Sequence, residues 1–151
     1  MKNGVVVLLV TIFVTSIGLN ADCVAQRGGR RGGGWSAGSV YNRMYDVTTV
    51  TTISGEVASV EQFVPYAGAP PGVHLIVATG SESISVHLGP AWFIENQDEV
   101  IDVGDAVTVT GSRIVYLEQA AIIAASVQTD GAALLLRDWR GIPVWSGWRR
   151  R

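Results

Sequence analysis

Residues 72–90 of the chain read GVHLIVATGSESISVHLGP. Two runs of apolar and β-branched residues, 73–79 and 84–88, flank a Gly-Ser-Glu-Ser turn, which is typical of a β-hairpin. Because side chains alternate across a strand, this hairpin has one apolar face that must line a core. The side chains predicted on that face are Val73, Leu75, Val77, Ile84, Val86 and Leu88.

Further strands are predicted on both sides of this hairpin. Residues 46–64 are dense in Val, Thr and Ile and indicate one long strand, with a bulge or bend at Gly55. Residues 91–97 follow Gly-Pro and indicate a helical turn, and 106–116 and 120–127 are two more strands. Five strands with a short helix between the third and fourth is the order of an OB barrel, so we predict an all-β, five-stranded OB-like barrel.

A C-terminal β-hairpin is predicted after the barrel. Its strands are 133–137 and 142–145, and Pro143 places the last strand at a sheet edge because proline has no N–H. Tryptophan and arginine then gather in the tail, as they do in protein interfaces. The predicted partner-binding residues are Trp145, Trp148, Arg149, Arg150 and Arg151, with a frayed, solvent-exposed tail as the equal alternative.

The N-terminal residues predict export. Residues 1–25 have a positive start, a mostly apolar stretch and small residues near Ala25, as in a cleaved signal peptide. The apolar stretch is shorter than the roughly 20 residues that span a bilayer, although an uncleaved anchor remains the alternative. We therefore expect a periplasmic or extracellular protein. Cleavage would remove Cys23, the single cysteine, and with it any disulfide or thiolate chemistry.

Composition divides the rest of the chain. Residues 26–45 are rich in Gly and Arg and are predicted to be a flexible linker. The OB-like barrel is assigned to 46–130, and the C-terminal hairpin with its Trp/Arg tail to 131–151.

The charges are sorted by position. Residues 46–136 hold eleven carboxylates and one cation, Arg113, whereas both flanks are rich in arginine. A groove that follows phosphates needs clustered Lys and Arg, so the acidic body disfavours nucleic acid as a partner. The basic flanks suggest peripheral association with anionic membranes.

The only two histidines, His74 and His87, are the candidate metal ligands. Pairing Thr79 with Ile84 places both on the outward face of the first hairpin, diagonally adjacent. They could hold Cu or Zn if a third ligand completed the shell. Ordinary outward polar positions are the competing interpretation, so we expect no cofactor except this metal ion.

No catalytic arrangement is visible in the sequence. Five carboxylates between Glu95 and Asp105 lack the alternation of a calcium-binding loop, so a solvated acidic connection is expected. A Ser-His-Asp order and a phosphate-binding loop are also missing. Trp92 and Phe93 are predicted to plug the barrel. We therefore expect that the protein is not an enzyme.

Several segments resemble the domain of the MamS/MamX magnetosome-associated proteins: GEVASVEQF, GVHLIVAT, VHLGPAWFIENQ, GDAVTVTGSRI, AAIIAASV and LLLRDWRGIPVWSGWRR. The resemblance covers about residues 50–150. It implies an exported or membrane-associated accessory domain, connected in some members with iron handling and crystal maturation. The chain lacks the Cys-x-x-Cys-His motif of MamX, so covalent haem is not implied.

The sequence thus predicts an exported, non-catalytic OB-fold module that recognises a protein partner, or a cationic or metal-bearing ligand, through its acidic surface. The alternative is a periplasmic accessory protein for metal (iron or copper) handling or redox chemistry that uses His74 and His87. Sugar binding on the outer barrel face, a general habit of OB folds, also stays open.

Overall fold

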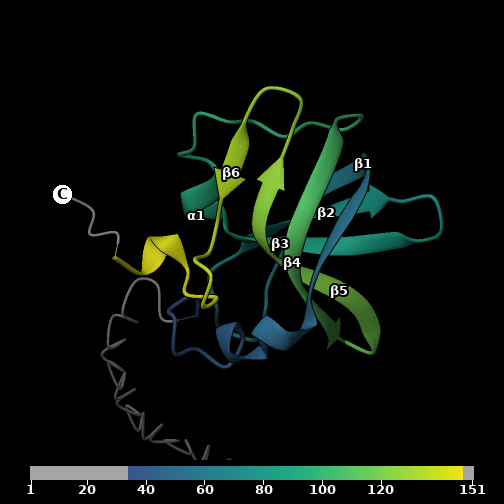
Figure 1. Ribbon diagram of the computed structural model, residues 1–151. Coiled ribbons are helices and arrows are strands. Elements are labelled where there is room, and N and C mark those ends of the chain that lie inside the picture. Colours follow the sequence, from purple (N-terminus) through teal and green to yellow (C-terminus); the bar gives the residue numbers. More distant parts are fainter. Residues whose placement is uncertain (1–33, 148–151) are drawn as a thin grey trace, which may run out of the picture.

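The computed structural model describes residues 34–147 and is mostly β (Figure 1). Six strands form one sheet, with little helix around it. The strands are β1 (Val50–Phe63), β2 (Gly72–Ala78), β3 (Ser83–Pro90), β4 (Ala106–Tyr116), β5 (Gln119–Gln128) and β6 (Ala133–Leu135). The helices are α1 (Ala91–Ile94) and the 3-10 helices η1 (Asn42–Met44), η2 (Val47–Thr49) and η3 (Val144–Gly147). The predicted all-β class is confirmed.

The strands lie in the order β3-β2-β1-β4-β5-β6, with antiparallel neighbours. The long β1 serves two partners, because its first half pairs with β4 and its second half with β2. In addition, β3 pairs in parallel with β5, through Ser85–His87 against Ala121–Ile123. Each of the strands β1 to β5 is therefore paired with two of the others, in a closed cycle.

The bend of β1 differs in detail from the prediction. Its register against β2 shifts between Val57 and Ser59, a few residues after Gly55. Gly55 has another role, because a Cβ atom there would lie 2.3 Å from the carbonyl oxygen of Ala78. The missing side chain lets the end of β2 approach β1 closely.

The core lies inside this ring of strands. All six hairpin side chains predicted to face it are buried, with at most 8% of any of them exposed. Phe93 of α1 is also buried, whereas its neighbour Trp92 only packs against the core from the side. The alternation of the hairpin sequence therefore predicted its inner face correctly.

The prediction of a flexible linker over residues 26–45 is wrong for residues 34–45. Trp35 and Tyr41 are 0% and 1% exposed, and their rings meet edge to face at 5.0 Å. The Trp35 indole N–H donates to the carbonyl of Pro70 at 2.8 Å. Burial of two aromatic rings repays the ordering of this glycine-rich segment, which composition alone did not reveal. Residues 26–33 lie outside the described part of the chain.

The predicted C-terminal hairpin is reduced to a single bridge between Arg137 and Pro143. Its first strand, β6, pairs with β5 instead. Asp138 organises the turn, because its side chain accepts from the backbone N–H groups of Arg140 and Ile142. Pro143 cannot donate to a ladder, and the chain continues into η3.

Trp145 was predicted to bind a partner, but it lies in the interior. Only 3% of it is exposed, and its indole N–H donates to the carbonyl of Trp35 at 2.8 Å. This bond brings the two ends of the described chain side by side (Figure 1). The other predicted partner-binding residues, Trp148, Arg149, Arg150 and Arg151, lie outside the described residues.

Candidate functional site

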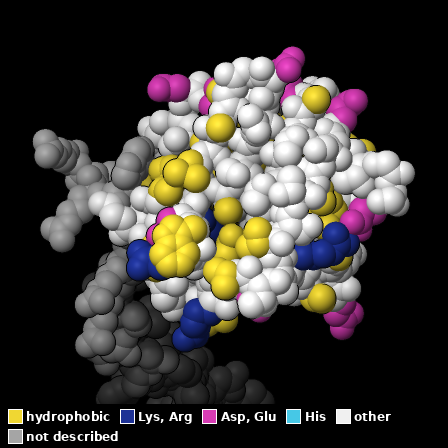
Figure 2. All heavy atoms as spheres, viewed as in Figure 1, with side chains coloured by type: hydrophobic (Ala, Val, Ile, Leu, Met, Phe, Trp, Pro, Cys, Tyr) yellow, Lys and Arg dark blue, Asp and Glu magenta, His cyan; other side chains and the backbone are white. Residues whose placement is uncertain are grey.

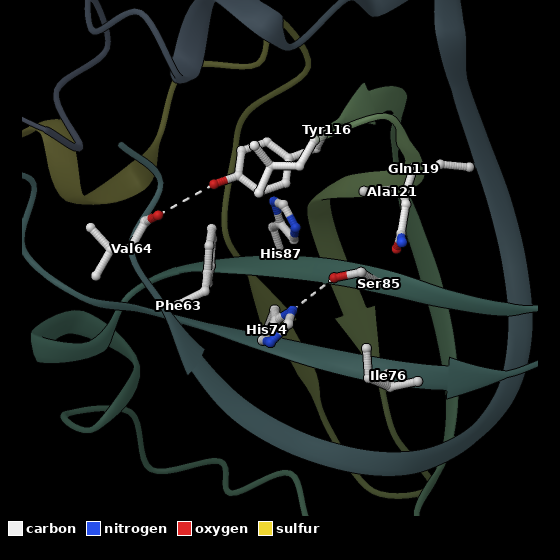
Figure 3. Close-up of a pocket in the computed structure, with 11 residues that line it drawn as sticks. Phe63, Val64, His74, Ile76, Ser85, His87, Tyr116, Gln119 and Ala121 are labelled. Carbon is white, nitrogen blue, oxygen red and sulfur yellow. Dashed lines mark hydrogen bonds between the residues drawn. The ribbon is translucent and has the colours of Figure 1, made fainter. Parts of the chain in front are cut away.

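A cavity of about 410 Å³ opens on the outer face of β2 and β3, between the end of β1 and the turn that joins β4 to β5 (Figure 3). Its volume falls within the range of roughly 300–1,000 Å³ found for small-molecule sites. Most of the lining is apolar, with a few polar groups that point into it. The polar lining residues are His74, Ser85, His87, Tyr116 and Gln119, and the apolar walls include Phe63, Ile76 and Ala121.

The structure brings His74 and His87 closer than the predicted register does. Val77 rather than Thr79 pairs with Ile84, and the two histidines are direct partners across β2 and β3. Their ring centroids are 5.9 Å apart. The predicted register is wrong by two residues, which leaves both side chains on the same face but moves them from diagonal to opposite positions.

His74 is held at the rim of the cavity. Its Nδ1 lies 2.7 Å from the hydroxyl of Ser85 (Figure 3). Its Nε2 lies 3.5 Å from a carboxylate oxygen of Glu61. The Phe63 ring packs against it at 5.2 Å. These contacts fix the ring orientation while leaving its edge toward the cavity.

His87 points away from the hydrophobic core, as predicted, yet it is only 2% exposed because other aromatic rings cover it. Tyr41 stacks on it at 5.9 Å, and the Tyr41 hydroxyl lies 2.8 Å from its Nδ1. Phe63 and Tyr116 contact the ring at 4.4 and 4.9 Å. Figure 3 shows His87 between Tyr116 and Ser85.

Burial sets the charge of this site. Burial, together with the nearby His74 and Arg137, lowers the pKa of His87 to about 3. Burial also raises the pKa of the Tyr41 phenol above its ordinary value. Both groups are therefore neutral over the physiological pH range.

Arg137 lies close enough to His87 to lower its pKa and is 1% exposed. Its guanidinium donates to the carbonyl of Ala124 at 2.5 Å and to the side chain of Asn42 at 3.1 Å. It also lies over the rings of Trp145 and Tyr45, at 5.0 and 5.9 Å from their centroids. Burial lowers the pKa of Arg137 to about 10, so the group keeps its positive charge and opposes a second cation at His87.

Among residues 34–147, no three His, Cys, Asp or Glu side chains are close enough together to hold a metal ion. In the acidic connection, Asp105 accepts from the backbone N–H of Asp102, and Glu99 accepts from the hydroxyl of Thr129. These carboxylates therefore stabilise the local chain, as expected for a solvated connection. Acidic side chains stand out along the upper rim of Figure 2.

The turn beside the cavity carries backbone strain. Leu117 and Glu118 have φ angles of 47° and 64°, in the left-handed region that disfavours residues with a side chain. Leu117 is 79% exposed and Val64, on the other side of the opening, is 52% exposed. A strained, exposed leucine costs about 1–3 kcal/mol, and such strain is concentrated at binding sites.

Sequence reasoning identified the two histidines but missed their most important partners. Tyr41 falls in the segment assigned to a linker, and it reaches His87 across 46 positions of the chain. Tyr116 was assigned only as the end of a strand. The aromatic residues of the Gly/Arg-rich segment, Trp35 and Tyr41, were the available signal.

Within residues 34–147, no helix is long and apolar enough to cross a membrane. A protein-family model described as the MamS/MamX magnetosome protein family matches residues 49–134. This match confirms the resemblance found in the sequence. No curated protein gave a match to the chain.

Proposed function

The chain belongs to the MamS/MamX magnetosome protein family, and from that membership we propose that it is an exported, non-catalytic binding module with an OB-type barrel. The closure of β1 to β5 through the β3–β5 pairing supports this architecture, as does the place of α1 between β3 and β4. OB folds take their ligands on the face of the second and third strands, beside the loop between the fourth and fifth.

One observation carries the proposal: the cavity lies on that face. It combines apolar walls with convergent polar groups from β2 and β3, which is the usual make-up of a binding pocket. The exposed Leu117 on a strained turn at its edge offers an apolar contact to whatever enters. A ligand or an anchoring side chain of a protein partner would fit this space.

The same groups are poor catalysts. A general base works best when its pKa is near the operating pH, and the pKa of His87 is about 3. His74 has a carboxylate neighbour but no nucleophile beyond the Ser85 hydroxyl, which bonds to its Nδ1. Recognition without turnover is therefore the simpler role for this site.

The acidic body supports the choice of ligand class. Residues 46–136 contain eleven carboxylates and a single arginine, and that arginine is paired with Glu82 at 2.8 Å. A polyanion would be repelled from such a surface, so nucleic acid is not part of the proposal. Protein partners and uncharged molecules remain compatible with it.

Metal handling is the second candidate, because the rings of His74 and His87 are 5.9 Å apart and could share an ion if a ligand from outside residues 34–147 completed the shell. Titration with Cu²⁺ or Zn²⁺, followed by histidine NMR signals, tests it. Perturbation of both rings at micromolar metal would support it, and unperturbed signals would exclude it.

Export has its own test, which is the N-terminal sequence of the protein isolated from cells. The proposal expects a mature chain that begins near Gln26, after loss of residues 1–25. A chain that still carries Met1 would show that the segment is retained.

The binding proposal is tested by blocking the cavity. Ala120 is exposed and lines the cavity, whereas Ala133 is an exposed residue of β6 outside it. We would isolate the wild type, Ala120→Trp and Ala133→Trp from the cell envelope and record native mass spectra. A bound mass is expected on the wild type and on Ala133→Trp, and it should be missing from Ala120→Trp. Equal occupancy of all three proteins would overturn the proposal.

A further inference from the structure

We infer that the cavity recognises a neutral, largely apolar molecule through a carbonyl oxygen, and that this oxygen accepts a hydrogen bond from Nε2 of His87. The inference rests on the proposed function, because it names the class of ligand for the same site. It is carried by the hydrogen bonds of Tyr41 and His87, the lining of the cavity and the distribution of charge.

The first step assigns the proton on the Tyr41–His87 bond. Tyr41 is 1% exposed, and among the described residues its hydroxyl has one hydrogen-bond partner, Nδ1 of His87. If Nδ1 donated to the phenol oxygen, the phenol proton would be buried without an acceptor, which is costly. The phenol therefore donates, and Nδ1 accepts.

The second step places the remaining proton. A neutral imidazole carries one proton, and with Nδ1 acting as acceptor that proton must be on Nε2. Within residues 34–147, Nε2 of His87 has no hydrogen-bond acceptor, although the side chain is 2% exposed and lines the cavity. The site thus holds a nearly buried donor that a ligand can satisfy.

The third step defines the ligand group that fits. An N–H donor requires an acceptor, and a carbonyl oxygen is the strongest neutral acceptor that an organic molecule commonly presents. The Ser85 hydroxyl lies on the same wall as His87 and can serve the second lone pair or a neighbouring N–H. The walls formed by Phe63, Ile76 and Ala121 then match an apolar body.

The fourth step excludes charged ligands. A cation would be placed near Arg137, whose charge already opposes protonation of His87. An anion would approach a body with eleven carboxylates and would meet Glu61 at the rim beside His74. A neutral molecule avoids both penalties.

The test uses four benzene derivatives of similar size and the full chain. The probes are acetophenone, ethylbenzene, benzoate and benzylamine, and binding is followed through the histidine nitrogen signals. Acetophenone should bind about tenfold more tightly than ethylbenzene, as expected for one buried hydrogen bond, and should shift the Nε2–H signal of His87. Benzoate and benzylamine should bind more weakly than acetophenone.

Two variants locate the donor. His87→Asn keeps an acceptor near Tyr41 but removes Nε2, so the preference for acetophenone over ethylbenzene should fall below about twofold. Trp139→Ala changes an 85% exposed side chain outside the cavity and should retain the preference. The free wild-type protein provides a check without any substitution, because its spectrum should show a protonated Nε2 and an unprotonated Nδ1 in His87.

The outcomes separate the inference from the proposed function. If all four probes perturb the cavity signals equally, or if benzoate binds best, the carbonyl inference is overturned while the binding module stands. A proton on Nδ1 of His87 would also overturn it. If none of the probes reaches the cavity and the native mass spectra show no bound mass, the proposed function itself is lost.

Discussion

Acidification should destabilise this protein well above the pH at which carboxylates titrate. The pKa of His87 is about 3 in the folded protein, against about 6.5 in an unfolded chain. Between these two pH values, the unfolded chain binds a proton that the folded protein cannot bind. The contribution of neutral His87 to stability is therefore fully present above pH 6.5 and is lost as the pH falls below it.

The magnitude follows from the shift. Each pH unit below 6.5 costs about 1.4 kcal/mol until the folded pKa is approached, so the free energy of unfolding should fall by about 2 kcal/mol between pH 7 and pH 5. Asp and Glu ordinarily titrate near 4, outside this window. Since a small domain is stable by only about 5–15 kcal/mol, the loss is easily measured.

Urea denaturation provides the assay. Trp35 and Trp145 are 0% and 3% exposed, so their fluorescence should report unfolding. The wild type and His74→Asn should lose about 2 kcal/mol between pH 7 and pH 5, whereas His87→Asn should lose much less. The same pH dependence in His87→Asn, or none in the wild type, would refute a neutral, buried His87.

Three further substitutions test the fold around the site. Trp35→Ala should cost about 3–5 kcal/mol of unfolding free energy in urea, whereas Trp139→Ala, at an 85% exposed side chain, should change it by less than about 0.5 kcal/mol. If both substitutions changed the free energy of unfolding by similarly small amounts, residues 34–45 would be a linker after all. Arg137→Ala should cost about 3 kcal/mol, because the carbonyl of Ala124 and the side chain of Asn42 lose their donor; a neutral result would contradict that role. Leu117→Asn should stabilise the protein by about 0.5–1 kcal/mol and raise its melting temperature, because asparagine tolerates a φ of 47°. A lower melting temperature would show that contacts of the leucine side chain stabilise the turn.

The sequence predicted what alternation and local composition control. The inner face of the β2–β3 hairpin, the long β1 and the strands on either side of α1 all follow from spacing that is visible in the chain. The register did not follow, because the turn is tighter than predicted: Ala78 pairs with Ser83, and the N–H of Thr79 donates to the carbonyl of Glu82 at 2.8 Å. A shift of two residues keeps every side chain on its face of the sheet but changes which side chains lie opposite each other.

The sequence predicted only part of the candidate site. Two histidines on neighbouring strands are found by spacing, but their environment comes from residues distant in the chain, such as Tyr41 and Arg137. Burial converts His87 from an outward polar group into a neutral donor, and burial is a property of the whole fold. Trp145 shows the same effect: its sequence context predicts a surface anchor, but in the fold it packs against Trp35 in the core.

The most direct test of a ligand site on the β2–β3 face is to add the molecule recovered with the protein back to the isotope-labelled chain and to map the chemical shifts. The account predicts that the largest changes centre on Ser85, His87 and Ala121, around the cavity. Changes centred instead on the exposed Leu135, Trp139 and Ile142 would contradict it.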